Sequence, residues 1–157
     1  MRATIQMSAY LTPVDKFYPT CERTHAVLRI HCGQLSPIRV TEILGLEPTE
    51  SVKKGVAGKP NKLGLSPIGK VNLWMLDSEG HVDSLDLRDH IDWLLDRIES
   101  SSSNLLALRA QGVVMDVWTI WWSKNGDGGP TIWPSQMRRL ALLDLELSIG
   151  FSFYGND

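Results

Sequence analysis

The stretch VVMDVWTIWWSKNGDGGP, residues 113–130, joins a continuous apolar run to a glycine-rich turn. Side chains of a β-strand point alternately to two faces, so Trp118 and Trp122 share the face of Asp116. Trp121 lies on the other face. Because an unpaired carboxylate is rarely found in a core, the stretch predicts a strand that buries Trp121 and turns the other two tryptophans outward.

Strand and helix patterns alternate along the rest of the chain. Alternating or apolar runs predict strands at residues 24–32, 71–78, 113–122 and 146–155. Helical spacing predicts helices at residues 36–45, 83–100, 104–111 and 134–145. Ser36 is expected to cap the first helix and Gly45 to end it. Either Asp83 or Ser84 is expected to cap the second.

The order of these elements predicts an α+β fold with a mixed, mostly antiparallel sheet and helices packed on one face. Two βαβ-like halves, each with a glycine-containing turn and a proline-initiated helix, suggest a ferredoxin-like pseudo-duplication. Residues 1–23 would form an N-terminal extension or an extra strand, and residues 24–157 a single α+β domain. The predicted core consists of Ala26, Leu28, Ile30, Leu87, Ile91, Leu94, Leu95, Ile149, Phe151 and Phe153.

The composition excludes several classes of protein. The chain has 157 residues, of which 43% are hydrophobic, and its formal net charge of -2 is unlike the basic footprint of a nucleic-acid-binding protein. No apolar run reaches the roughly 18 residues of a membrane span, and the first residues lack the apolar centre of a signal peptide. Cys21 and Cys32 give no disulfide framework. We therefore expect a cytoplasmic protein with unbridged cysteines that contacts neither membranes nor nucleic acids.

Several segments occur together in an order that resembles one bacterial family. They are LSPIRVTEILGLEPTESVKKG (residues 35–55), the pair Leu73 and Trp74, DLRDHIDWLLDRIE (residues 86–99) and the terminal FSFYG (residues 151–155). The resemblance is to the family catalogued as domain of unknown function 4279. It implies a small, soluble, stand-alone bacterial domain, but it supplies no activity, cofactor or catalytic residue.

The residues that could carry chemistry lack recognisable partners. His25 and His31 share a strand face but lie about 20 Å apart at the usual rise per residue, so they cannot hold one ion. Neither His81 nor His90 belongs to a metal-ligand motif, and no serine or cysteine lies in a nucleophile motif. We therefore predict no metal site, no cofactor and no catalytic residue.

One predicted helix carries a row of acidic residues. Asp89, Asp92 and Asp96 are spaced so that their carboxylates gather on one helix face. We interpret this face as solvated, with Arg88 supporting Asp92 one turn away. His90 is expected at the border of the apolar stripe.

Two features remain as candidates for function. The first is the loop SVKKGVAGKPNKLGLSPIGK, residues 51–70, which carries lysines and no acidic residue. The second is the sheet face that bears Asp116, since tryptophan, tyrosine and arginine are enriched where proteins bind one another. The candidate partner-binding residues are Arg29, His31, Trp74, Asp116, Trp118, Trp122 and Tyr154 on the face, and Lys53, Lys54, Lys59 and Lys62 in the loop. Alternatively, the N-terminal segment or a second copy of the chain covers this face.

These features favour a non-enzymatic binding protein of the bacterial cytoplasm. Its partner would be a protein, or a second copy of the chain, held by the sheet face and the lysine loop. By analogy with other small, single-domain bacterial proteins we expect a toxin-neutralising immunity protein, and an acidic toxin surface would suit the lysines. The alternative is an enzyme or small-molecule-binding protein whose pocket lies between the lysine loop and the glycine-rich turn, with His31 or Asp116 as the acid/base group.

Overall fold

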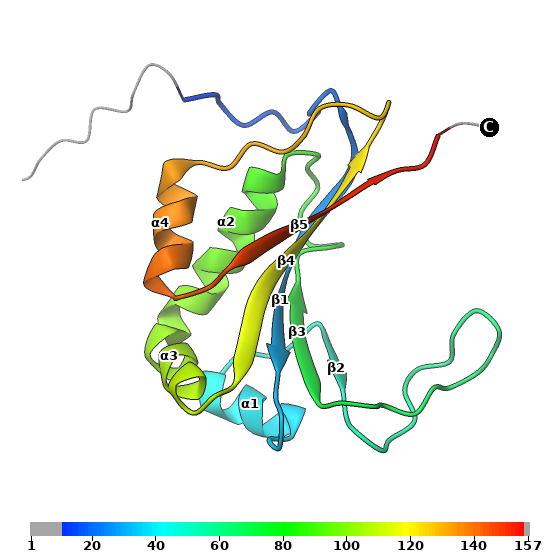
Figure 1. The fold of residues 1–157 in the computed structure, drawn as a ribbon, viewed down its shortest axis with the longest axis vertical. Helices are drawn as coiled ribbons and strands as arrows, with labels where there is room; N and C mark the ends of the chain where they lie inside the picture. Colours follow the sequence, from blue (N-terminus) through cyan, green and yellow to red (C-terminus); the bar gives the residue numbers. More distant parts are fainter. Residues whose placement is uncertain (1–10, 156–157) are drawn as a thin grey trace, which may run out of the picture.

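The computed structural model describes residues 11–155 of the chain. Its strands are β1 (Cys21–His31), β2 (Glu50–Val52), β3 (Leu73–Asp77), β4 (Val114–Ser123) and β5 (Leu147–Phe153). Its helices are α1 (Pro37–Leu44), α2 (Leu87–Ile98), α3 (Ser102–Ala110) and α4 (Pro134–Leu142), and a short 3-10 helix, η1 (Glu99–Ser101), joins α2 to α3. The strands form one sheet beside the helices (Figure 1), which confirms the predicted α+β class.

β1 is the central strand of a five-stranded sheet with the order β2-β3-β1-β4-β5. It pairs antiparallel with β3 on one side and with β4 on the other, β2 pairs antiparallel with β3, and β5 pairs parallel with β4. The sheet is therefore mixed and mostly antiparallel, as predicted. In the register of β1 and β4, Arg29 lies opposite Asp116 and Val27 lies opposite Trp118.

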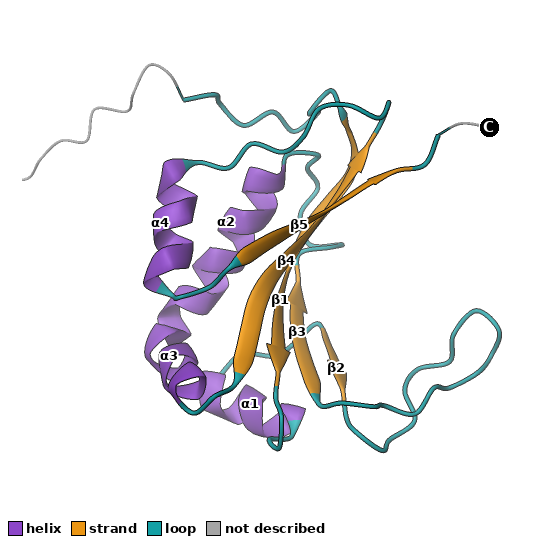
Figure 2. Ribbon diagram, in the orientation of Figure 1, coloured by secondary structure: helices purple, strands orange, loops and turns teal. Residues whose placement is uncertain are grey.

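The helices of the described region lie on one side of the sheet (Figure 2). Beyond the bulge at the start of β1, its even-numbered residues point toward them, so Ala26, Leu28 and Ile30 are fully buried. Among residues 11–155, none of the helices combines the length and the apolar character that crossing a membrane requires.

Most of the predicted core is confirmed. The predicted core residues of β1 and α2 belong to one hydrophobic cluster, namely Ala26, Leu28, Ile30, Leu87, Ile91, Leu94 and Leu95. The prediction is wrong for Ile149, Phe151 and Phe153, which are 42%, 48% and 47% exposed. These residues belong to β5, an edge strand with no neighbour on one side, so that flank of their side chains remains open.

The predicted ferredoxin-like pseudo-duplication is not confirmed, because the two βαβ-like halves differ in arrangement. β4, α4 and β5 do form a parallel βαβ unit. After β1 and α1, however, the chain forms the short edge strand β2, leaves the sheet and returns as β3, which pairs antiparallel with β1. Because β3 pairs antiparallel with both β1 and β2, these two strands run parallel with β3 between them, and β1-α1-β2 is a split βαβ unit. In the second half, β4 and β5 are direct neighbours, so the two halves differ in strand arrangement.

Local sequence sets the ends of the helices. Ser36 caps α1 by accepting a hydrogen bond from the Arg39 N–H at 3.2 Å, and Gly45 ends it with φ of 65°, as predicted. α2 begins later than expected. Its N-cap is Asp86, whose Oδ1 accepts a hydrogen bond from the backbone N–H of Arg88 at 3.1 Å, and the prediction of Asp83 or Ser84 is wrong.

Asp86 also forms a buried ion pair with the side chain of Arg88. Both side chains are fully buried, and Nη2 of Arg88 donates to Oδ2 of Asp86 at 2.6 Å. Arg88 further donates to the carbonyl oxygens of Thr12 and Pro13, and Asp86 accepts from the Asp15 N–H at 2.9 Å. The pair therefore fastens the segment that precedes β1 to the start of α2.

Two residues of the acidic row of α2, Asp92 and Asp96, contact another helix. Arg139 of α4 donates to Asp92 at 3.1 Å, to Asp96 at 2.5 Å and to Glu99 at 2.6 Å. These bonds help to dock α4 against α2. The prediction that Arg88 supports Asp92 is wrong, because Arg88 is fully buried, whereas Asp96 is 66% exposed, as expected of a solvated face.

Cys21 and Cys32 are unbridged, as predicted, and both are buried. Cys21 begins β1 and Cys32 follows its last residue, so the strand holds them about 36 Å apart, far beyond the reach of a disulfide. Burial raises the pKa of Cys21 to about 11 and also raises the pKa of Cys32. Both thiols therefore remain protonated and unreactive near neutral pH.

We predict that Arg88→Met lowers the free energy of unfolding by about 3–5 kcal/mol, because it leaves the Asp86 carboxylate buried without its partner. Chemical denaturation measures the change. Arg138→Met, at an exposed position of α4, is the matched control and should change stability by no more than about 0.5 kcal/mol. Equal losses in the two variants would contradict a special role for the buried pair.

The same pair predicts how stability depends on pH. Burial alone would raise the pKa of Asp86, but hydrogen bonds from Arg88 and from the backbone N–H of Asp15 hold it below its ordinary value. A carboxylate with a lowered folded-state pKa stabilises the fold at neutral pH, and this contribution is lost as the pH falls below about 4. The difference in unfolding free energy between wild type and Asp86→Asn should therefore narrow when denaturation is repeated from about pH 6 down to about pH 3. A difference that stays constant over this range would contradict the prediction.

Candidate functional site

The side of the sheet opposite the helices is covered by no helix among residues 11–155, and we call it the open face. Odd-numbered residues of β1 and even-numbered residues of β4 point to it. Residues 11–20 run along the helix side, where Thr12 accepts hydrogen bonds from Arg88 and Trp133. The described part of the N-terminal segment therefore does not cover the open face, and residues 1–10 lie outside the described residues.

One half of the open face is organised around Arg29. Its Nε and Nη2 donate to the two carboxylate oxygens of Asp116 at 2.8 Å and 2.5 Å, which raises the pKa of Arg29. The guanidinium also lies over the Trp118 ring, 4.9 Å from its centroid. On β5, a Cβ added to Gly150 would lie 2.7 Å from Cζ2 of Trp118, so only glycine leaves room for the indole. The half-buried Trp118 ring is thus held in a fixed place.

A second arginine–tryptophan stack lies farther along β4. The guanidinium of Arg23 lies 4.7 Å from the centroid of the Trp122 ring. Tyr154, which is 65% exposed, meets Trp122 edge-on with the ring centroids 4.9 Å apart. Trp118 and Trp122 are both on β4, so the two arginine–tryptophan stacks form one row along this strand.

Two residues that were predicted on the open face, Trp74 and His31, do not lie within it. Trp74 is fully buried on the helix side of β3, where its Nε1 donates to Oγ1 of Thr41 at 3.0 Å. The prediction that Trp74 lies on the open face is wrong. Trp74 pairs with Ile30, whose side chain also faces the helices. His31 is exposed at the last position of β1, opposite Val114 and at the edge of the face.

Residues 53–70 form a lysine arm that leaves the sheet between β2 and β3 (Figure 1). Isolated bridges between Lys54 and Gly69 and between Ala57 and Ile68 hold its two limbs together. The predicted lysines are all exposed, namely Lys53, Lys54, Lys59 and Lys62. The arm is therefore an ordered, positively charged projection.

Hydrogen bonds also order the tip of the lysine arm. Oδ1 of Asn61 accepts from the backbone N–H groups of Leu63 and Leu65 at 2.9 Å and 3.0 Å. Leu63 is 82% exposed and Leu65 is 62% exposed. The tip thus presents apolar side chains beside the charges of Lys59 and Lys62, a combination suited to binding a protein.

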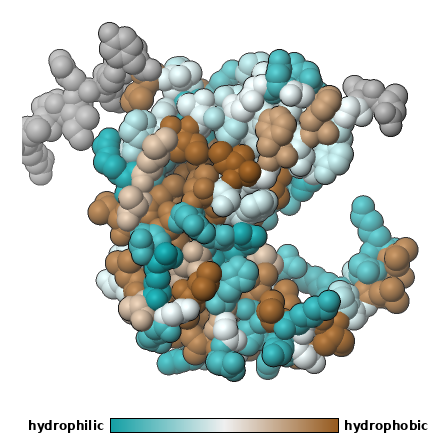
Figure 3. Space-filling model, viewed as in Figure 1, coloured by the Kyte–Doolittle hydropathy of each residue, from teal (hydrophilic) through white to brown (hydrophobic). Residues whose placement is uncertain are grey.

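The lysine arm and the open face border one concave region. The arm extends on the side of the sheet away from the helices (Figure 1), and the surface is hollowed between the arm and the body of the domain (Figure 3). A cavity of about 690 Å³ lies at the base of the arm, lined by β2 and by both limbs.

Residues 11–155 do not form the alternative pocket between the lysine loop and the glycine-rich turn. The arm leads into β3, whose Leu73 pairs with His31 at the end of β1. The glycine-rich turn follows Ser123, which pairs with Cys21 at the start of β1. These two ends of β1 are about 33 Å apart at the usual rise per residue, so the predicted position of the pocket is wrong.

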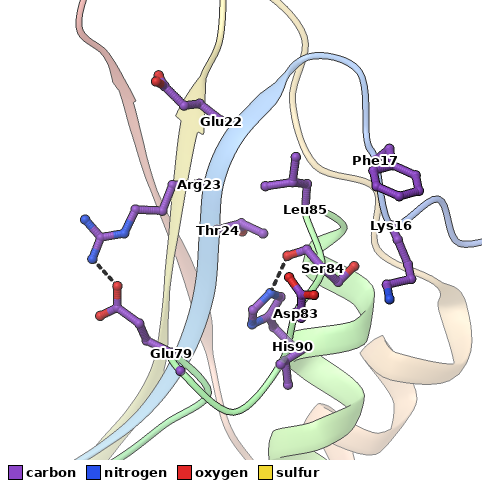
Figure 4. Close-up of a pocket in the computed structure, with 12 residues that line it drawn as sticks. Lys16, Phe17, Glu22, Arg23, Thr24, Glu79, Asp83, Ser84, Leu85 and His90 are labelled. Carbon is purple, nitrogen blue, oxygen red and sulfur yellow. Dashed lines mark hydrogen bonds and ion pairs between the residues drawn. The ribbon is translucent and has the colours of Figure 1, made fainter.

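A second cavity of about 420 Å³ opens near the start of β1, lined by residues that include Arg23, Glu79 and His90 (Figure 4). His90 is buried, not at a border as expected, and burial lowers its pKa. Its Nδ1 lies 2.8 Å from Oγ of Ser78 and its Nε2 lies 2.8 Å from the Ser84 carbonyl oxygen. Because both ring nitrogens are engaged, His90 holds the loop before α2 in place and is not a free base.

His25, Asp77 and Glu79 form a polar cluster that the sequence did not predict. Nδ1 of His25 lies 2.7 Å from Oδ1 of Asp77, and its Nε2 lies 3.9 Å from Oε2 of Glu79. Asp77 ends β3 and Glu79 follows it in the next loop, so the pairing of β1 with β3 brings them to His25. No motif spans this separation, and the only signal in the sequence is two acidic residues at the end of a predicted strand.

The comparisons with known proteins identify a family but no activity. The family model described as "Domain of unknown function (DUF4279)" matches residues 22–154. The match runs from the second residue of β1 to just beyond β5, so it spans the whole sheet and its helices. No curated protein and no solved structure matches the chain.

Trp121 is buried as predicted, and it packs against Phe151 and Tyr18. We predict that Trp121→Ala lowers the free energy of unfolding by about 3–5 kcal/mol. Trp122→Ala removes a half-buried ring from the open face and should cost clearly less. Chemical denaturation followed by circular dichroism compares the two variants. Equal losses would show that Trp122 belongs to the core and would contradict the assignment of the open face.

Proposed function

Because the chain belongs to the DUF4279 family, whose description assigns no activity, we propose from its geometry that it is a non-enzymatic binding protein. Its partner fits the concave region between the open face and the lysine arm. The observation that carries this proposal is the row of two arginine–tryptophan stacks on a sheet face that no helix of residues 11–155 covers.

The open face has the properties of a binding hot spot. Tryptophan and arginine side chains supply most of the energy at such sites when their conformations are fixed before binding. Trp118 is fixed between Arg29 and Gly150, and Trp122 between Arg23 and Tyr154. A partner that covers these rings therefore loses little entropy in ordering them.

The lysine arm adds charge and reach. The chain as a whole has a formal net charge of -2, yet the arm concentrates lysines with no acidic residue among them. Such local charge speeds association with an oppositely charged surface and excludes basic partners. The arm therefore favours a protein with an acidic surface.

The specific role we propose is neutralisation of a toxin in the bacterial cytoplasm. An immunity protein must bind tightly and carry no chemistry of its own, and the open face and the lysine arm meet that need without a catalytic group. A second copy of the chain is the other partner that the open face would accept.

Retention from a lysate of the source bacterium tests the proposal. The purified protein is immobilised, the retained proteins are identified by mass spectrometry, and affinities for the purified partner are then measured. Trp122→Ala and the double variant Lys59→Glu, Lys62→Glu should each weaken binding at least about tenfold. Co-expression of the chain should also abolish the toxicity of this partner.

Arg138→Glu, on the helix side of the molecule, is the matched control and should leave the affinity unchanged. Binding that persists in both test variants would contradict the proposed surface. A retained partner that is not toxic would leave the binding surface standing and overturn the immunity role.

A further inference from the structure

The side chain of His25 is buried but incompletely satisfied. It is only 5% exposed, and its Nε2 has no hydrogen-bond partner. Among residues 11–155, the one other buried side-chain nitrogen or oxygen without a partner is Nε1 of Trp121. Because buried polar atoms are nearly always paired, Nε2 of His25 is available to a ligand.

The hydrogen bond at the other ring nitrogen determines what Nε2 can bind. Oδ1 of Asp77 lies 2.7 Å from Nδ1 of His25, and because a carboxylate only accepts, Nδ1 carries the hydrogen. In the neutral ring Nε2 then offers a lone pair. It faces Oε2 of Glu79, a second acceptor, at 3.9 Å. Two lone pairs that face each other without a donor between them favour a bound cation.

The separation of these atoms suits a single metal ion. His25, Asp77 and Glu79 form one compact group, and its two atoms that remain for an ion, Nε2 of His25 and Oε2 of Glu79, lie 3.9 Å apart. Zinc bonds of about 2.0–2.2 Å place two ligand atoms of a tetrahedral site about 3.4 Å apart. Glu79 is 49% exposed, so solvent gives an ion an entry path to its carboxylate.

We propose that Nε2 of His25 and the carboxylate of Glu79 bind a divalent transition-metal ion of the zinc type, with Asp77 orienting the imidazole. Asp77 is itself held in place, because its Oδ1 accepts from the Glu79 N–H at 2.9 Å and its N–H donates to Oγ1 of Thr49 at 2.9 Å. A carboxylate behind a ligating histidine is a common support for zinc. Imidazole ligation disfavours calcium and magnesium, which prefer oxygen ligands.

Arg23 controls the affinity of this site. Its guanidinium forms an ion pair with Oε1 of Glu79 and stacks on Trp122. The positive charge of Arg23 therefore opposes the approach of a second cation to the same carboxylate. Through Arg23 the metal site borders the open face.

Isothermal titration calorimetry of the full chain, without an affinity tag, tests the proposal with Zn²⁺ as the probe. Wild type should bind one ion, and calcium or magnesium should not compete. Glu79→Gln should weaken binding at least about tenfold, and Asp77→Asn about 10–100-fold. Arg23→Gln should bind zinc more tightly than wild type, because it removes the competing charge.

Glu22→Gln is the matched control, since Glu22 is an exposed β1 residue outside the proposed ligand set. Its zinc affinity should equal that of wild type, and circular dichroism verifies that each variant is folded. Equal zinc affinities in Glu79→Gln and Glu22→Gln would overturn the proposal and assign the ion to an exposed histidine such as His31 or His81. The absence of zinc binding by wild type would overturn it as well.

Discussion

The alternation of side chains along β1 is the constraint on which the rest of this structure depends. β1 is paired on both edges, so a shift of one residue would disrupt two registers and exchange the faces of the sheet. Ala26, Leu28 and Ile30 pack against the helices, whereas Arg23, His25 and Arg29 point to the other side of the sheet. The hydrophobic core and the candidate sites are thus two faces of the same strand.

Arginine and lysine have separate uses in this chain. Arg29, Arg88 and Arg139 each hold at least one carboxylate, and they fix the open face, the segment before β1 and the docking of α4 on α2 respectively. The planar, multiple-donor guanidinium suits such fixed geometry. The lysines of the arm are exposed and placed for contact with solvent or a partner. The paired arginines therefore stabilise the domain, whereas the lysines of the arm contribute no ion pair to it among the described residues.

The predictions succeeded where the pattern is local and failed where it depends on neighbours. The alternation in residues 113–122 was sufficient to bury Trp121 and to turn Trp118 outward. The same rule misplaced Trp74, because the face of β3 depends on its register with β1. The alternation rule also led to the wrong prediction that Phe151 is buried, because the sequence does not show that β5 is an edge strand. The proximity of His25 to Asp77 follows from strand order, which periodicity does not specify.

The lysine arm is an excursion between two strands that pair with each other, and this position has a consequence for recognition. β2 and β3 close the connection with their own ladder, so the arm can gain or lose residues without moving any strand of the sheet. Under the proposed function, a change of partner would therefore require changes in this segment alone, without any change in the strands that carry the core.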